Sequence, residues 1–112
     1  MTYRSARTRG KFAPWLETTK GRSGVYVIRS TLTKTVLYVG ESHSGTLYKT
    51  ITRHFWDWGD RTKRHHYTVG VLPVEVGIRL MPASQAQDEQ DRLIVRLRPR
   101  HNRNVPTDEV PF

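Results

Sequence analysis

Two short segments rich in β-branched and aromatic residues most constrain the fold of this chain. "GVYVIRS" spans 24–30 and "TVLYVGES" spans 35–42, and the polar stretch "TLTK" joins them. Val, Ile and Tyr are typical of strands, and a connection this short brings two strands together as an antiparallel hairpin. The sequence therefore predicts an antiparallel hairpin that carries one tyrosine on each strand.

The faces of this hairpin follow from the alternation of side chains along a strand. In the second strand, Tyr38 is expected to share a face with Val36, opposite Leu37 and Val39. In the first strand, the same rule places Tyr26 and Ile28 on one face and Val25 and Val27 on the other.

The remaining segments predict a helix, a third strand and a second helix. A helix is expected to begin near Thr46 and end at Gly59, because apolar residues recur at helical spacing; they are Leu47, Ile51, Phe55 and Trp58. "LPVEVGIRLMP" alternates as a strand bounded by Pro73 and Pro82. The second helix is expected at 83–97, before Pro99.

This order predicts a single α+β unit, and 112 residues suit one domain. We expect a small three-stranded antiparallel sheet flanked by helices within residues 21–112. Residues 1–20 are expected to form a basic N-terminal arm, irregular or partly helical. Phe12, Trp15 and Leu16 can anchor that arm to the domain.

The charge of the chain points to a polyanionic partner. Lys and Arg total 19 against 10 Asp and Glu, and such an excess is typical of proteins that bind nucleic acid. The absence of cysteine excludes disulfides and thiolate metal sites. Because no apolar run approaches the roughly 20 residues that span a bilayer, we expect a cytoplasmic protein with no membrane partner.

Four motifs taken together resemble the GIY-YIG nuclease superfamily. "GVY" and "YVG" match its defining pair, "LYKTITRHF" is similar to its helix, and "LIVRLRPRHN" is similar to its closing segment. The resemblance covers about residues 22–104. It implies the GIY-YIG fold and an endonuclease that hydrolyses DNA phosphodiester bonds with one Mg²⁺ or Mn²⁺, in a protein of bacterial, phage or plasmid origin.

The resemblance also implies roles for individual residues. Tyr26 and Tyr38 would orient or deprotonate a water molecule, a role open to a phenol whose pKa is lowered by nearby charge. Arg53 would contact phosphate oxygens, with Lys49 as the alternative. His54 is either a site histidine or a packed one. Three further residues are assigned structural roles: Gly24 and Gly40 leave room for close packing, and Asn102 fixes the closing segment or the site.

One position departs from the family pattern. The metal-binding glutamate of the family usually lies nine residues before the proline and twelve before the asparagine, and this count ends on Gln90. Gln90 is also expected inside the buried stripe of its helix, although its amide offers a cation no anionic ligand. Three explanations stay open: Glu89 takes the role, the chain binds without cutting, or the residue is an engineered Glu→Gln change.

Further basic residues are candidates for contact with the phosphate backbone of DNA, and RNA is not excluded as a partner. Besides Lys49, they are Arg61, Lys63, Arg64, Arg98 and Arg100. Glu41 and His43, just after Tyr38, are secondary candidates for the site. Two alternative functions stay open: a non-catalytic nucleic-acid-binding module on the same fold, and an unrelated basic protein such as a ribosome-associated one.

Overall fold

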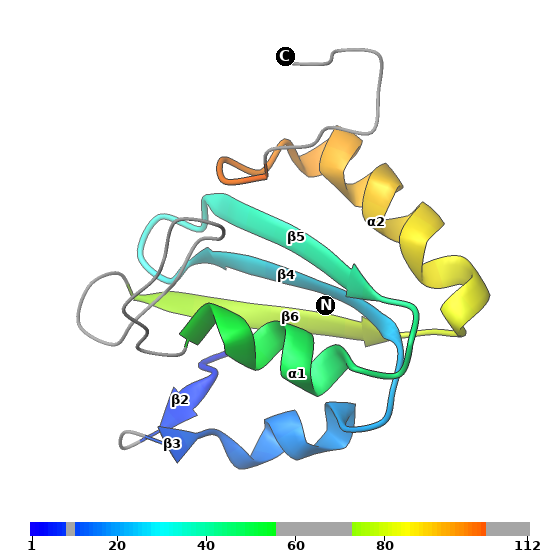
Figure 1. Cartoon of the computed structure of the whole chain (residues 1–112). Helices are drawn as coiled ribbons and strands as arrows, with labels where there is room; N and C mark the ends of the chain where they lie inside the picture. Colours follow the sequence, from blue (N-terminus) through cyan, green and yellow to red (C-terminus); the bar gives the residue numbers. More distant parts are fainter. Residues whose placement is uncertain (9–10, 56–72, 103–112) are drawn as a thin grey trace.

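The computed structural model describes residues 1–8, 11–55 and 73–102. Two helices and six strands lie in this part of the chain (Figure 1). The strands are β1 (Tyr3–Arg4), β2 (Arg7–Thr8), β3 (Lys11–Phe12), β4 (Gly24–Ser30), β5 (Val36–Ser42) and β6 (Val74–Leu80). The helices are α1 (Leu47–Thr52) and α2 (Ala83–Leu97), and two 3₁₀ helices, η1 (Pro14–Thr19) and η2 (Arg53–Phe55), accompany them.

The main sheet has four antiparallel strands in the order β1-β6-β4-β5, so the prediction of three strands is wrong. The fourth strand comes from the N-terminal segment, where Tyr3 pairs with Gly77 and Arg4 with Val76. A Cβ at Gly77 would lie 3.0 Å from the Tyr3 ring, so glycine leaves room for this ring. A pairing between residues so far apart in the sequence leaves no local pattern to predict it.

Two hydrophobic clusters cover the two faces of the sheet. Tyr26 and Ile28 pack with α1 and the N-terminal segment, whereas Val25 and Val27 pack with α2. Figure 1 shows α1, β2 and β3 on one side of the sheet and α2 running beyond β5. The predicted faces of the first strand are therefore confirmed.

The predicted faces of the second strand are partly wrong. Ile28 pairs with Tyr38 and Arg29 with Val36, so Leu37 is an extra residue that bulges between them. The bulge places Leu37 in the same cluster as Tyr38, while Val36 packs in the other cluster, with Val39.

The predicted bounds of the second helix and the predicted start of the first are confirmed. The second one, Ala83–Leu97, agrees with the prediction, and its last turn is closed by Arg98 in the left-handed conformation. The first begins after Thr46 and continues as η2, with Leu47, Ile51 and Phe55 buried as expected. Its predicted end, with Trp58 and Gly59, lies outside the described residues. Among the described helices, none is long and apolar enough to cross a membrane.

The N-terminal segment is packed onto the α1 side of the sheet. Leu16 of η1 is buried in the core, and Trp15 donates a hydrogen bond from Nε1 to the carbonyl of Ser5 at 2.8 Å. Arg7 donates from Nη1 to the carbonyl of Phe55 at 3.1 Å, which ties β2 to the end of η2. The segment expected to form an arm is thus partly helical, as predicted, but it also contributes strands and core residues.

A charged network joins β1, β4 and β6 on the α2 side. Glu75 is paired with Arg29 and, at 3.2 Å, with Lys34, while the Arg29 guanidinium lies 3.5 Å from the centre of the Tyr3 ring. Burial acts to raise the pKa of Glu75, but its hydrogen bonds to Arg29 and Lys34 and their charges outweigh this effect and lower it. Glu75 therefore stays ionised at a lower pH than an ordinary carboxyl group does, and its ion pairs persist to the same lower pH.

Candidate functional site

Three of the predicted site residues meet on the α1 side of the sheet. Tyr26 comes from β4, Tyr38 from β5 and His54 from η2. The Tyr26 hydroxyl lies 2.9 Å from His54 Nε2, and the ring centres of Tyr38 and His54 are 4.6 Å apart. The two tyrosine rings are 6.0 Å apart. We call Tyr26, Tyr38 and His54 the aromatic cluster.

The members of the aromatic cluster differ in exposure. Tyr26 and His54 are each 1% exposed, so their hydrogen bond is sealed from water. Tyr38 is only partly buried. Among the described residues, Tyr38 is therefore the most accessible member of the cluster, and Tyr26 and His54 are its buried members.

Glycine at position 40 makes this arrangement possible. Tyr26 and Gly40 are directly paired across β4 and β5. A Cβ at Gly40 would lie 2.3 Å from both Cζ and the hydroxyl oxygen of Tyr26. Gly24, with φ 157°, meets a similar limit, because its Cβ would lie 2.3 Å from the carbonyl oxygen of Arg79. Both glycines thus allow close packing, and that at Gly40 sets the position of the Tyr26 ring.

The chemistry open to the aromatic cluster is proton exchange and hydrogen bonding. A phenol and an imidazole in contact form a donor–acceptor pair, whose direction depends on the histidine tautomer. Such a pair can orient a neighbouring hydroxyl or hold a proton for it. Arg53, which precedes His54 in the chain, is partly exposed, and Lys49 is exposed. Both side chains are cations, which are able to pair with phosphate oxygens.

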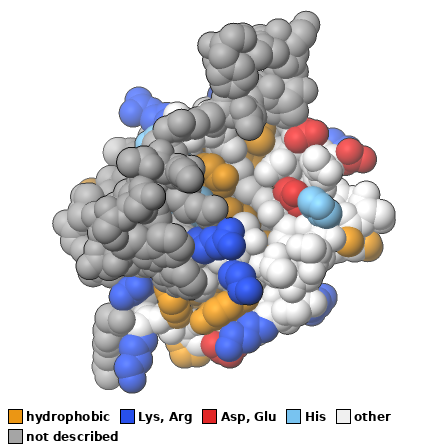
Figure 2. Space-filling model, in the orientation of Figure 1, with side chains coloured by type: hydrophobic (Ala, Val, Ile, Leu, Met, Phe, Trp, Pro, Cys, Tyr) orange, Lys and Arg blue, Asp and Glu red, His pale blue; other side chains and the backbone are white. Residues whose placement is uncertain are grey.

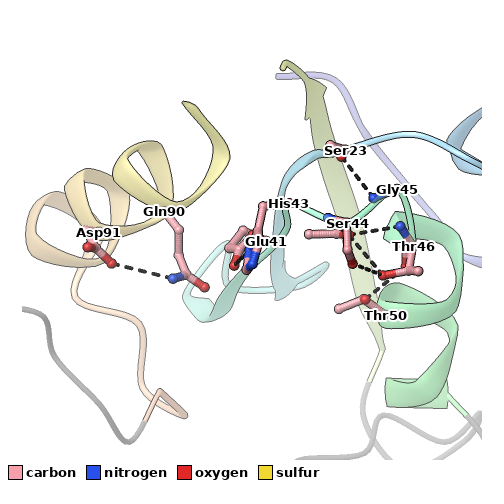
Figure 3. A network of polar contacts seen from close by, with 10 residues as sticks. Ser23, Glu41, His43, Ser44, Gly45, Thr46, Thr50, Gln90 and Asp91 are labelled. Carbon is pink, nitrogen blue, oxygen red and sulfur yellow. Dashed lines mark hydrogen bonds and ion pairs between the residues drawn. The ribbon is translucent and has the colours of Figure 1, made fainter. Parts of the chain in front are cut away.

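Gln90 lies on the helix that covers the opposite face. It is half-buried on α2, and its amide nitrogen lies 3.5 Å from a carboxylate oxygen of Asp91. In Figure 3 its side chain extends from α2 toward the end of β5, where Glu41 and His43 lie. Nδ1 of His43 is 2.9 and 3.1 Å from the two carboxylate oxygens of Glu41. The described contacts of Gln90 are therefore made on the α2 side of the sheet.

Glu89, the alternative to Gln90, is held by two arginines. Arg79 Nη1 lies 3.1 Å from one carboxylate oxygen, and Arg92 is hydrogen-bonded to the other. Its side chain is only 15% exposed. These ion pairs occupy both oxygens that would otherwise bind a cation.

A divalent cation does not fit the described residues near Gln90. An amide contributes no charge, and both oxygens of Glu89 are engaged, whereas Mg²⁺ is normally bound through one or two free carboxylates. In the described ranges, no three His, Asp or Glu side chains form a group that could hold a metal ion. We derive no catalytic step through a metal from this geometry.

Polar side chains order the chain between β5 and α1 (Figure 3). Ser42 Oγ lies 3.0 Å from Thr46 Oγ1 and accepts a hydrogen bond from the Thr46 backbone. Ser23 Oγ accepts one from the Gly45 amide at 3.0 Å. Thr50, one turn before His54, donates its hydroxyl to the carbonyl of Thr46 at 2.9 Å. These bonds fix the start of α1 relative to β5, and so help to position His54.

Asn102 connects the closing segment to the strand that carries Tyr38. Its Oδ1 accepts from the Val39 amide at 2.9 Å, and its Nδ2 donates to the Val39 carbonyl at 2.8 Å. The backbone amides of Arg100 and His101 also donate to the carbonyls of Val36 and Leu37. Arg100 and His101 lie in a turn, and residues 100–102 bind backbone groups at the outer edge of β5.

The prediction that Phe12, Trp15 and Leu16 anchor the N-terminal segment is confirmed, but sequence reasoning missed the polar contacts of this segment with η2 and α1. Arg7 holds the end of η2, and Lys20 lies over the Tyr48 ring, 4.7 Å from its centre. The only sequence signal for these residues is the basic and aromatic composition of the segment. Arg98 and Arg100 are exposed at the end of α2. Arg61, Lys63 and Arg64 lie outside the described residues.

Comparisons of the chain with protein-family models, with curated proteins and with solved structures found no match.

Replacing Asn102 by alanine should weaken the attachment of residues 100–102 to β5. We expect a loss of about 2 kcal/mol in the free energy of unfolding, because two buried backbone groups of Val39 lose their partner. Urea unfolding measures this loss, and hydrogen exchange of the Val39 amide locates it. Asn102→Asp keeps the acceptor and should protect this amide better than alanine does. An exchange rate of Val39 that is unchanged in Asn102→Ala would contradict the role of Asn102.

Proposed function

We propose that this chain is an endonuclease domain of the GIY-YIG type, which hydrolyses phosphodiester bonds of DNA. The observation that carries this proposal is the convergence of Tyr26, Tyr38 and His54, which come from three elements separated in the sequence. A buried tyrosine hydroxyl needs a hydrogen-bond partner, and here that partner is an imidazole whose ring also contacts a second, partly buried tyrosine. This combination of three proton-exchanging side chains supports a chemical role for the cluster. The order of the elements, two strands followed by helix, strand and helix, agrees with the resemblance in the sequence.

The burial of the cluster suggests how its members divide the work. Tyr38 is the exposed member and would orient the attacking water against the phosphorus atom. Tyr26 and His54 would hold the Tyr38 ring in place, and they would accept or donate a proton during the reaction. Arg53, with Lys49 as the alternative, would contact the phosphate oxygens on which negative charge develops. A divalent cation would stabilise this charge further, and the described residues near Gln90 form no group that could hold one.

The first test is the nicking of supercoiled plasmid DNA in buffer with Mg²⁺ or Mn²⁺. We expect slow nicking by the natural chain and a loss of about 100-fold or more in Tyr38→Phe, because the hydroxyl that orients the water is removed. Tyr3→Phe is the matched control, since Tyr3 is a partly buried tyrosine on the other face. Equal rates for Tyr38→Phe and Tyr3→Phe would contradict the assignment of Tyr38.

A second function is favoured by one observation. Gln90 has no charge and Glu89 is engaged by Arg79 and Arg92, which suits a domain that binds DNA without cutting it. Affinity for DNA that falls steeply as salt rises, without cleavage by either the natural chain or Gln90→Glu, would establish this binding function instead.

A further inference from the structure

The N-terminal segment and α1 together form a surface of alternating cations and aromatic rings. The Arg7 guanidinium lies 5.0 Å from the centre of the Phe12 ring, and the rings of Phe12 and Tyr48 meet edge to face at 6.4 Å. On the other side, the Lys20 ammonium lies 4.7 Å from the centre of the Tyr48 ring. We call the surface around Phe12, Tyr48 and Lys20 the basic aromatic face.

Charge is concentrated in the part of the chain that builds this face. Residues 1–55 contain two acidic side chains, Glu17 and Glu41, against ten basic ones. The ten are Arg4, Arg7, Arg9, Lys11, Lys20, Arg22, Arg29, Lys34, Lys49 and Arg53. Figure 2 shows Lys and Arg side chains following one another over α1 and the N-terminal segment, with hydrophobic side chains beside them. Arg29 and Lys34 pair with Glu75 on the α2 side, whereas Arg7, Lys11, Lys20 and Lys49 belong to the N-terminal segment and α1. The face is thus positively charged, and it lies on the same side of the sheet as the aromatic cluster.

The acidic residue on this face is already paired. Glu17 lies 2.9 Å from Lys20 Nζ, and both side chains are more than half exposed. Exposed ion pairs of this kind contribute little and are screened by salt, so a phosphate group can compete for Lys20. Lys11 and Lys49 are exposed as well.

Aromatic rings beside cations distinguish unpaired nucleotides from duplex DNA. In a duplex the faces of the bases are covered by their neighbours, and only phosphates and groove edges are offered to a flat protein surface. An unpaired strand offers both phosphates for the lysines and base faces for the rings, and each stacked base contributes about 1–3 kcal/mol. The Phe12 and Tyr48 rings also pack against the core, and because both are only partly buried, part of each ring remains accessible beside the cations.

We propose that the basic aromatic face binds unpaired nucleotides of a DNA strand, through base stacking on Tyr48 and Phe12 and phosphate contacts to Lys20 and Lys49. This inference deepens the proposed function, on which it rests, by naming a substrate class: DNA with a single-stranded portion next to the site of cleavage.

The test is the fluorescence anisotropy of a labelled single-stranded oligonucleotide of 12 thymidines, titrated with the chain in metal-free buffer. We expect tighter binding to this strand than to a duplex of the same length. Tyr48→Leu keeps apolar packing but removes the ring, and should raise the Kd about 10-fold. Lys20→Ala should raise the Kd several-fold and reduce the slope of log K against log salt by about 0.7.

The chain offers two closely matched controls. Tyr3 is a partly buried tyrosine with a cation over its ring, as is Tyr48, but it packs on the α2 side. Lys34 is 55% exposed and paired with Glu75, as Lys20 is 54% exposed and paired with Glu17. Tyr3→Leu and Lys34→Ala should change the Kd less than about two-fold. Circular dichroism of each variant verifies that it is folded.

Several outcomes would overturn the proposal. They are equal affinity for single strand and duplex, equal effects of Tyr48→Leu and Tyr3→Leu, and tighter binding of the corresponding uridine RNA. Failure of the face is distinguishable from failure of the nuclease proposal, because binding is measured without metal and without cleavage. If the chain nicks plasmid but Tyr48→Leu binds the oligonucleotide normally, only the basic aromatic face is refuted. If Tyr48 matters for binding but no DNA is cut, the face stands and the endonuclease proposal fails.

Discussion

Gln90→Glu should raise the rate of plasmid nicking in Mg²⁺ or Mn²⁺ about 100-fold or more. Gln and Glu have nearly the same shape, so the change adds a negative charge at little steric cost, and it replaces the amide that lies 3.5 Å from Asp91 by a second carboxylate. A carboxylate at this position gives a divalent cation the anionic ligand that the amide lacks. One such cation stabilises the negative charge of the transition state at the phosphate by several kcal/mol. The measurement is the initial rate of conversion of supercoiled to open-circular plasmid.

Two further variants make this result specific. Tyr26→Phe in the Gln90→Glu background should abolish the gained activity, because the hydroxyl that contacts His54 is lost. Glu89→Gln in the same background should leave the rate within about two-fold, because the ion pairs of Glu89 with Arg79 and Arg92 are exposed on the arginine side and contribute little. If the natural chain already cuts fast and Glu89→Gln stops it, Glu89 holds the cation and the assignment of Gln90 is wrong.

Gly40→Ala should destabilise the chain by about 3 kcal/mol or more and displace Tyr26. The added Cβ would overlap the Tyr26 ring at 2.3 Å, a separation that non-bonded carbon atoms do not reach. Tyr26 is buried on the central strand β4 and is paired with Gly40 on β5, which residues 100–102 hold from the other side, so neither backbone moves without disturbing the sheet. Urea or thermal unfolding measures the loss in stability, and the proton resonances of the Tyr26 and His54 rings report the displacement.

A double-mutant cycle isolates this contact. Tyr26→Leu ends short of the ring atoms that the new Cβ would meet, so Gly40→Ala should cost much less stability in that background. Gly21→Ala is a comparison in which a Cβ has nothing within 4 Å, so its cost reflects only the backbone, which has φ 71°. Additive effects of Gly40→Ala and Tyr26→Leu would show that the glycine serves another purpose.

Local patterns in the sequence predicted the elements that are formed by neighbouring residues. Sequence reasoning predicted the hairpin, the strand between Pro73 and Pro82 and the helix Ala83–Leu97. The spacing of apolar residues and the prolines that bound these segments are enough to determine them. The fourth strand and the bulge at Leu37 were not predicted. Both depend on pairings across the sheet, and no periodicity within one segment contains that information.

The candidate site shows the same division. The sequence motif selected Tyr26, Tyr38 and His54, but it left open whether His54 serves the site or the core. The structure shows that His54 is buried and also contacts Tyr26, because η2 continues α1 with a tighter turn after Thr52. The helical position of Gln90 was predicted as well. The pairing of Glu89 with Arg79 joins α2 to β6, two segments that only the tertiary structure brings together, so it could not be predicted from one segment.

The pairing of residues 100–102 with β5 has a consequence for the chain in solution. An edge strand with free amides and carbonyls is a template for strands of other molecules. Here the carbonyls of Val36 and Leu37 and both backbone groups of Val39 are already bonded to the segment that follows α2. The same three residues that hold the Tyr38 strand in place also cap the sheet against self-association, so a chain shortened before Arg100 would lose protection from aggregation together with order at the site.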